Sequence, residues 1–259
     1  MTTQKRLLFS QFNPEEFEQI CQLLCSIFNT TPVEIAALYQ AMKRDFEKPD
    51  YPKQFVNRDF FQPLDPKFLD IYQASPVVAT DLPGTLEWDD GIINKPTVMI
   101  FGQDSKHGYS YPDLVVGIPY GLNHKDSREN LTRTTTYFKM IQEVMNLGYR
   151  VYLTDIWKMW VCDPASPYKS KMLSKVDLDR FLSILQQEVC IPQPKAVITW
   201  GKTAQRSIDQ LQLPCKHLTI PHPSGMPNSA WRALIGKQSF ANKFAYWQQF
   251  LQEHLGAVT

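Results

Sequence analysis

Short apolar runs alternate with amphipathic segments along the second half of this chain. Continuous apolar runs bounded by turn residues predict buried strands, and apolar residues recurring at helical spacing predict helices. The predicted strands cover residues 97–101, 150–153, 196–200 and 216–220. The predicted helices cover residues 128–147, a segment that begins after the capping residue Ser174, residues 204–211 and residues 240–251. Because such alternation is typical of a parallel sheet covered on both faces, we expect an α/β fold. Its predicted form is a three-layer α/β/α sandwich with a central four-stranded parallel sheet.

The N-terminal third of the chain has a different pattern. Two segments begin with a capping residue, a proline and a glutamate three positions after the cap: Asn13-Pro14-Glu15-Glu16 and Thr31-Pro32-Val33-Glu34. This order predicts two helix starts. Residues 48–96 are rich in proline and aromatic residues, which favours an ordered, mostly irregular connector around a short helix at 66–74. We expect residues 1–94 to form a helical extension and connector packed on a main domain at residues 95–259.

Composition narrows the possible partners and compartments. The chain has 27 basic and 26 acidic residues, a formal charge of +1, so no global positive field indicates a nucleic-acid partner, although a local basic patch would suffice. Its five cysteines lack CxxC or Cys/His ligand spacing, so we expect neither a metal site nor a cofactor. There is no signal peptide and no apolar run long enough to span a bilayer, and we expect a cytoplasmic protein without a membrane partner.

Two loops carry the candidate chemistry. The apolar run that ends at Phe101 is followed by Gly102, which lets the backbone turn sharply near a ligand, and then by the carboxylate of Asp104. The last predicted strand delivers His222 and Ser224 in the loop Ile220-Pro221-His222-Pro223-Ser224-Gly225. Each loop could be an ordinary turn. At the carboxyl ends of parallel strands, however, both would open into one crevice.

Together these loops resemble a known pair. The segment Phe101-Gly102-Gln103-Asp104-Ser105-Lys106-His107-Gly108 and the His222 loop resemble the GQDPYH and HPSP signatures of the uracil-DNA glycosylase superfamily. The order of the loops and the strands between them also agree, and the resemblance covers roughly residues 95 to 255. It implies a monomeric, monofunctional DNA glycosylase of base-excision repair. Such an enzyme hydrolyses the N-glycosidic bond of a flipped uracil or modified pyrimidine in DNA.

Cleavage of a glycosidic bond needs a carboxylate that stabilises the oxocarbenium-like sugar and positions the attacking water. It also needs hydrogen-bond donors that stabilise the negative charge on the departing base. The resemblance gives Asp104 the first role and His222 the second, with backbone N–H groups near Gln103 as further donors. Val116-Gly117-Ile118-Pro119-Tyr120-Gly121 looks like the GVPFG segment of single-strand-selective uracil glycosylases, so Tyr120 would stack on the base. The alternative is a core tyrosine beside a turn.

Asp155 departs from the family pattern. Thr154-Asp155-Ile156-Trp157-Lys158 lies where relatives resemble TNVVK, whose asparagine reads the edge of the base. An ionised aspartate only accepts hydrogen bonds, so it would repel uracil O4 and suit a base with an exocyclic amine. Alternatively, burial beside Asp104 could raise one pKa and leave a protonated carboxyl.

We expect the DNA backbone to be contacted by Ser105, Lys106, Lys158 and Ser224, and the gap left by the base to be filled by Met226. Two alternatives stay open. One is a catalytically inactive or nucleotide-binding member of the fold, which the altered Asn, Pro and Tyr positions favour. The other is an N-glycosidase of free nucleosides or nucleotides, which the absence of a basic groove beside the crevice would favour.

Overall fold

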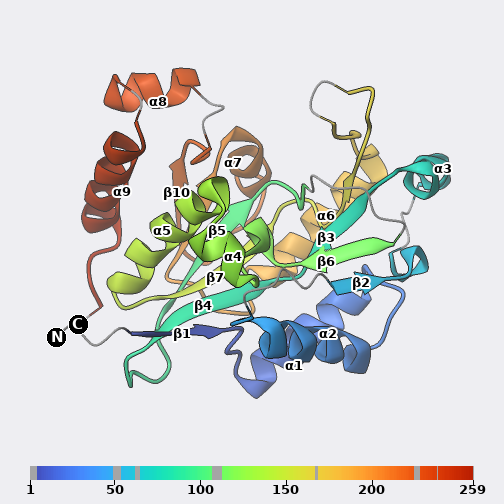
Figure 1. The fold of residues 1–259 in the computed structure, drawn as a ribbon, viewed down its shortest axis with the longest axis horizontal. Helices are drawn as coiled ribbons and strands as arrows, with labels where there is room; N and C mark the ends of the chain where they lie inside the picture. Colours follow the sequence, from blue (N-terminus) through green and yellow to red (C-terminus); the bar gives the residue numbers. More distant parts are fainter. Residues whose placement is uncertain are drawn as a thin grey trace.

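A six-stranded mixed sheet forms the centre of the molecule (Figure 1). The computed structural model describes residues 5–48, 54–61, 65–106, 113–166, 169–224, 228–237 and 239–258. The strand order is β1-β4-β7-β5-β9-β10. Their bounds are Arg6–Phe9 for β1, Gly84–Asp89 for β4, Arg150–Asp155 for β7, Thr97–Gly102 for β5, Ala196–Trp200 for β9 and Lys216–Ile220 for β10.

The mixed α/β class is confirmed, but the expectation of a purely parallel four-stranded central sheet is wrong. The four predicted strands do pair in parallel, as β7-β5-β9-β10. The sheet then continues through β4 and β1. The strand β4 pairs antiparallel with β7, and β1 pairs antiparallel with β4. The strand β4 lies within the segment expected to be mostly irregular. Its backbone groups are satisfied by pairing with β7, a partner more than sixty residues away that local composition does not reveal.

A second sheet of four short strands lies beside the first, in the order β2-β6-β3-β8. These strands are Gln54–Val56, Leu114–Gly117, Val78–Asp81 and Trp160–Val161. Two of them, β2 and β3, also fall within residues 48–96, so this connector is more regular than expected. The two sheets therefore draw strands from both sides of the predicted domain boundary between residues 94 and 95.

Local signals placed the helix starts well. The Asn13 side chain caps α1 (Pro14–Cys25), Thr31 and Glu34 form a capping box on α2 (Pro32–Asp45), and Ser174 caps α6 (Lys175–Glu188). The helix expected at residues 128–147 is instead two, α4 (Lys125–Glu129) and α5 (Thr132–Asn146). The remaining α-helices are α3 (Pro66–Ala74), α7 (Lys202–Ile208), α8 (Asn228–Ile235) and α9 (Phe240–His254).

Helices pack on both faces of the central sheet. On one face, Tyr152 of β7 hydrogen-bonds Glu188 of α6, and its ring contacts Phe12 just before α1. On the other face, Trp200 of β9 packs against Tyr137 of α5 and Trp247 of α9. Most buried apolar side chains form one continuous core around these contacts. Of the helices in the described part of the chain, none has the length and apolar character needed to cross a membrane.

Candidate active site at the carboxyl edge of the sheet

Four parallel strands deliver polar side chains to one edge of the central sheet. Gly102 at the end of β5 lies in register with Asp155 at the end of β7, and Asp104 follows two residues later. On the other side of β5, Trp200 ends β9 in register with Ile220 of β10, which leads directly to His222. Because parallel strands end at the same edge of a sheet, this arrangement brings Asp104, Asp155 and His222 to one side of the molecule.

Asp104 is a half-buried carboxylate held by its own loop. Gln103 donates from Nε2 to Asp104 Oδ2 at 2.9 Å. Burial raises the pKa of Asp104 above its ordinary value, while the hydrogen bond from Gln103 and the charge and backbone N–H of Lys106 lower it. A carboxylate with a raised pKa is a better proton acceptor than an ordinary aspartate, which suits a group that orients an attacking water.

Asp155 belongs to a cluster of carboxyl groups. Its side chain is 2% exposed, and it is hydrogen-bonded to Asp81 at the end of β3. Burial, followed by the nearby charges of Asp81 and Asp104, raises the pKa of Asp155 well above its ordinary value. Burial likewise raises the pKa of Asp81 to about 7, although its hydrogen bond with Asp155 lowers it. Asp81 and Asp155 are thus two hydrogen-bonded carboxyl groups in one buried site, and their raised pKa values mean that the pair keeps a proton to higher pH than exposed aspartates do.

Asp81 is a residue of this site that the sequence pattern did not indicate. It is brought to Asp155 by the second sheet, where β3 lies within the proline-rich connector, and nothing in its local sequence distinguishes it from a turn aspartate. In the described residues, no group of three His, Cys, Asp or Glu side chains is arranged to hold a metal ion. Asp81 and Asp155 form a hydrogen-bonded pair of carboxyl groups, with the charge of Asp104 nearby.

Tyr120 connects this cluster to the rest of the edge. It lies in the short 3₁₀ turn η2 (Pro119–Gly121) with a positive φ of 65°, an uncommon conformation for a bulky residue. Its ring centroid is 4.4 Å from that of Tyr137 and 5.2 Å from that of Trp200. A Cβ atom at Gly102 would lie 2.7 Å from the Tyr120 hydroxyl and would overlap the Asp155 carboxylate. The glycine thus leaves room for both polar groups beneath the strand end.

Three buried polar atoms at this edge have no hydrogen-bond partner within the described residues: Asp155 Oδ2, the Tyr120 hydroxyl and Trp200 Nε1. Leaving a buried polar atom unpaired costs about 1–3 kcal/mol. Such groups gathered at one strand edge are expected where a ligand or water supplies the missing partners.

His222 is held in one tautomer by its own loop. The backbone N–H of Ser224 donates to His222 Nδ1 at 3.2 Å, and the Ser224 hydroxyl lies 2.9 Å from the same nitrogen. Because Nδ1 accepts a backbone hydrogen bond, the proton of the neutral ring is on Nε2. Trp231 Nε1 donates to the His222 carbonyl at 2.9 Å, which fixes the loop to α8. The imidazole also meets the ring of Tyr137 edge to face at 5.6 Å, and Tyr137 in turn contacts Tyr120.

Two of the residues expected to contact DNA lie inside the protein instead. Lys158 is 1% exposed and forms an ion pair of 2.6 Å with Glu188, so it is part of the interior. Ser105 is 4% exposed, and its hydroxyl donates to the carbonyl of Ala79 at 2.9 Å. The sequence pattern could not reveal that Lys158 and Ser105 are buried, because their partners Glu188 and Ala79 are distant in the chain.

The other expected DNA contacts differ in position. Lys106 is exposed and lies two residues after Asp104, and Ser224 is half-buried with its hydroxyl 2.9 Å from His222 Nδ1. Met226 lies outside the described residues, as do His107 and Gly108 of the first loop. Their predicted roles stay predictions.

No protein-family model matches this chain, and no curated protein matches it. The resemblance carried by the two loops therefore stays a prediction, and any function must be argued from the site itself.

Proposed function

We propose that this protein is a monofunctional DNA glycosylase that hydrolyses the N-glycosidic bond of a flipped uracil or modified pyrimidine. The observation that carries the proposal is the pairing of two loops at one sheet edge. One loop holds a carboxylate of raised pKa, Asp104, and the other holds an imidazole, His222, whose tautomer leaves Nε2–H as a donor. The aromatic contacts from His222 through Tyr137 to Tyr120 connect the two halves.

In the proposed reaction, Asp104 orients a water molecule and accepts one of its protons as the water oxygen attacks the sugar C1′ and the bond to the base breaks; the proton then passes to the departing base or to solvent. The carboxylate also stabilises the positive charge that develops on the sugar ring. The electron pair of the broken bond stays with the base, and His222 Nε2–H donates a hydrogen bond to the base oxygen where negative charge accumulates. No cofactor takes part in this scheme, and we place the enzyme in the cytoplasm as a monomer.

The base would be read by Asp155. Its carboxyl group is hydrogen-bonded to Asp81, and its Oδ2 has no hydrogen-bond partner among the described residues. Such an oxygen accepts from the N3–H of uracil or from the exocyclic amine of a cytosine-like base. Tyr120 would contribute its ring to stacking and its unpaired hydroxyl to a further hydrogen bond.

The test is a base-release assay on oligonucleotides that carry uracil, thymine, cytosine or a modified pyrimidine, in single-stranded and duplex form. We expect release from at least one substrate, and we expect Asp104→Asn to slow it by roughly 10²- to 10⁴-fold because a positioned proton acceptor is lost. Asp179→Asn, which alters an exposed aspartate of α6, is the matched control and should keep full activity. Wild-type activity in the Asp104 variant would refute the assigned role.

A second candidate is an N-glycosidase of free nucleosides. It is favoured by the interior positions of Lys158 and Ser105, which remove two expected contacts to DNA, and by the carboxyl cluster, which would repel a phosphate. Free nucleosides therefore form one arm of the same assay. Release from nucleosides but from no oligonucleotide would replace the first proposal with this one, and release from neither would reject both.

A further inference from the structure

A large groove with basic side chains on its walls lies away from the carboxyl edge of the sheet. It has a volume of about 1190 Å³, and its walls come from β1, β4, α2, α4 and α5. Neither Asp104, Tyr120, Asp155 nor His222 lines it. Its volume exceeds the roughly 300–1,000 Å³ that is usual for a small-molecule pocket, so the groove has room for a ligand longer than one small molecule.

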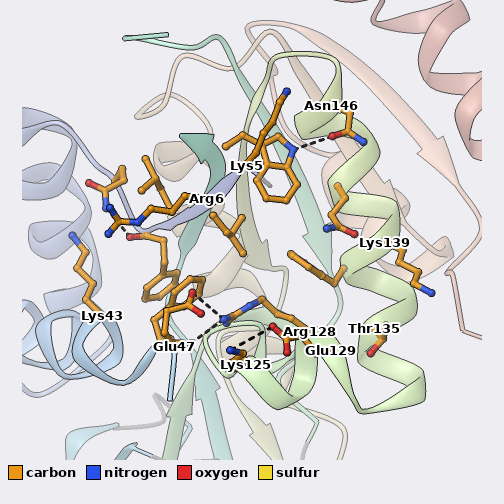
Figure 2. A pocket seen from close by; sticks show the side chains of 18 of the residues that line it. Lys5, Arg6, Lys43, Glu47, Lys125, Arg128, Glu129, Thr135, Lys139 and Asn146 are labelled. Carbon is orange, nitrogen blue, oxygen red and sulfur yellow. Dashed lines mark hydrogen bonds and ion pairs between the residues drawn. The ribbon is translucent and has the colours of Figure 1, made fainter. Parts of the chain in front are cut away.

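The charges in this groove are unbalanced. Besides Arg128, its lining cations are Lys5, Arg6, Lys43, Arg44, Lys125 and Lys139, and its only lining carboxylates in the described residues are Glu47 and Glu129. Figure 2 shows Lys43 and Lys139 on opposite walls, with Arg6 between them. Because the whole chain carries a formal charge of only +1, this excess is a local feature of the groove.

Several of these cations have no carboxylate partner in the described part of the chain. Among the described residues, no ion pair with a carboxylate is formed by Lys5, Arg6, Lys43 or Lys139. The Lys139 ammonium lies 5.7 Å from the centroid of the Phe240 ring. Lys43 is half-buried, and this burial lowers its pKa, so holding its charge in the groove is costly without an anion nearby. Arg128 differs, since it donates to the carbonyls of Leu122 and Phe46 and therefore serves the fold.

The floor of the groove is apolar and offers one accessible ring among the described lining residues. Phe138 is buried, and Phe46 lies between the Phe9 ring and the Arg128 guanidinium. The half-buried Trp88, held by a hydrogen bond of 2.9 Å from its Nε1 to Asn146, is the ring on which a base can stack. Cations along the walls and an accessible aromatic ring are the two elements of a surface that binds single-stranded nucleic acid, where phosphates meet the cations and an unpaired base meets the ring. Bases in a duplex cannot reach such a floor.

We infer that this groove binds single-stranded nucleic acid. The inference deepens the proposed function, because it supplies a backbone contact in place of the two residues found in the interior. The helix α5 connects the two regions: Tyr137 contacts His222, while the next residues, Phe138 and Lys139, line the groove. A strand lying here has its phosphates on the basic side of α5, away from the carboxyl cluster.

The test is the binding of an unmodified, fluorescein-labelled single strand of about 12 nucleotides, followed by anisotropy over a range of salt concentrations. No excisable base is present, so the result does not depend on catalysis. For Lys43→Ala/Lys139→Ala we expect roughly tenfold weaker binding, and a salt dependence whose slope falls by about 1.4, because each phosphate contact on a single strand contributes about 0.7.

The matched control is Lys175→Ala/Lys195→Ala, which removes the same charge from two exposed sites outside the groove. It should bind like the wild type, and thermal unfolding should show that both double variants stay folded. Equal losses in the two double variants, or none in the groove variant, would overturn the inference. So would groove-dependent binding of anionic phosphatidylserine vesicles without binding of the single strand.

Failure here and failure of the proposed enzyme are distinguishable. Base release without groove-dependent binding would reject only the role of the groove in binding single strands. Groove-dependent binding without base release would support that role and reject the proposed glycosylase.

Discussion

At the scale of single residues, the raised pKa of Asp155 shows how the position of a side chain changes its chemistry. An exposed aspartate is ionised at neutral pH, but this one is buried beside two further carboxyl groups. The pKa of a buried carboxyl rises because its charge loses hydration and meets like charges. A carboxyl that keeps its proton to higher pH repels a base oxygen less than an ionised aspartate does, so Asp155 resembles the asparagine of the family pattern more closely than its sequence indicates.

The raised pKa values of Asp155 and Asp81 predict that stability falls with rising pH. The folded-state pKa values of Asp155 and Asp81 lie above their unfolded values, so the stability they contribute is present at low pH and is lost as the pH rises through the folded values, about 7 for Asp81. Between pH 5 and pH 8, the unfolding free energy of the wild type should fall. That of Asp155→Asn should fall by roughly 1–3 kcal/mol less. Urea unfolding at both pH values measures this, with Asp179→Asn as the control. An equal fall of the unfolding free energy in all three proteins would contradict the raised pKa values.

At the scale of elements, the packing at the end of β5 requires a glycine at position 102. A Cβ atom at Gly102 would overlap the Asp155 carboxylate, so Gly102→Ala should force the strand end and the tyrosine turn apart. Overpacking of this kind costs about 1–3 kcal/mol, and we expect base release to fall with it. Gly91→Ala is the comparison: its added Cβ meets nothing within 4 Å, so only the cost of its positive φ remains and base release should persist. Urea unfolding and the base-release assay distinguish the two variants.

At the scale of the whole molecule, a buried ion pair ties α6 to the central sheet. Lys158 and Glu188 are 2.6 Å apart with both side chains 1% exposed, and the Tyr152 hydroxyl also donates to Glu188. Removing one partner leaves a buried charge without compensation, so Glu188→Gln should cost about 3–5 kcal/mol of unfolding free energy. Asp179→Asn, which breaks the exposed pair with Lys175 on the same helix, should cost about 0–1 kcal/mol. Similar costs for the two variants in urea unfolding would show that the interior pair is not structural.

Features with a local cause could be predicted from the sequence. The caps at Asn13, Thr31 and Ser174 were predicted because a capping side chain bonds to a backbone N–H only two or three residues away. The strand from Ala196 to Trp200 was predicted because a buried strand needs a continuous apolar run. The carboxyl-edge positions of Asp104 and His222 followed from those strands.

Features that depend on distant partners were decided only by the tertiary structure. The sequence by itself determined which segments become helices and parallel strands, and which loops carry an acid and an imidazole. The tertiary structure decided that Gly84–Asp89 joins the central sheet, that Asp81 meets Asp155, and that Lys158 turns inward to Glu188. The physical reason is that burial and electrostatic coupling depend on groups brought together by folding, whereas capping and periodicity act within a few residues.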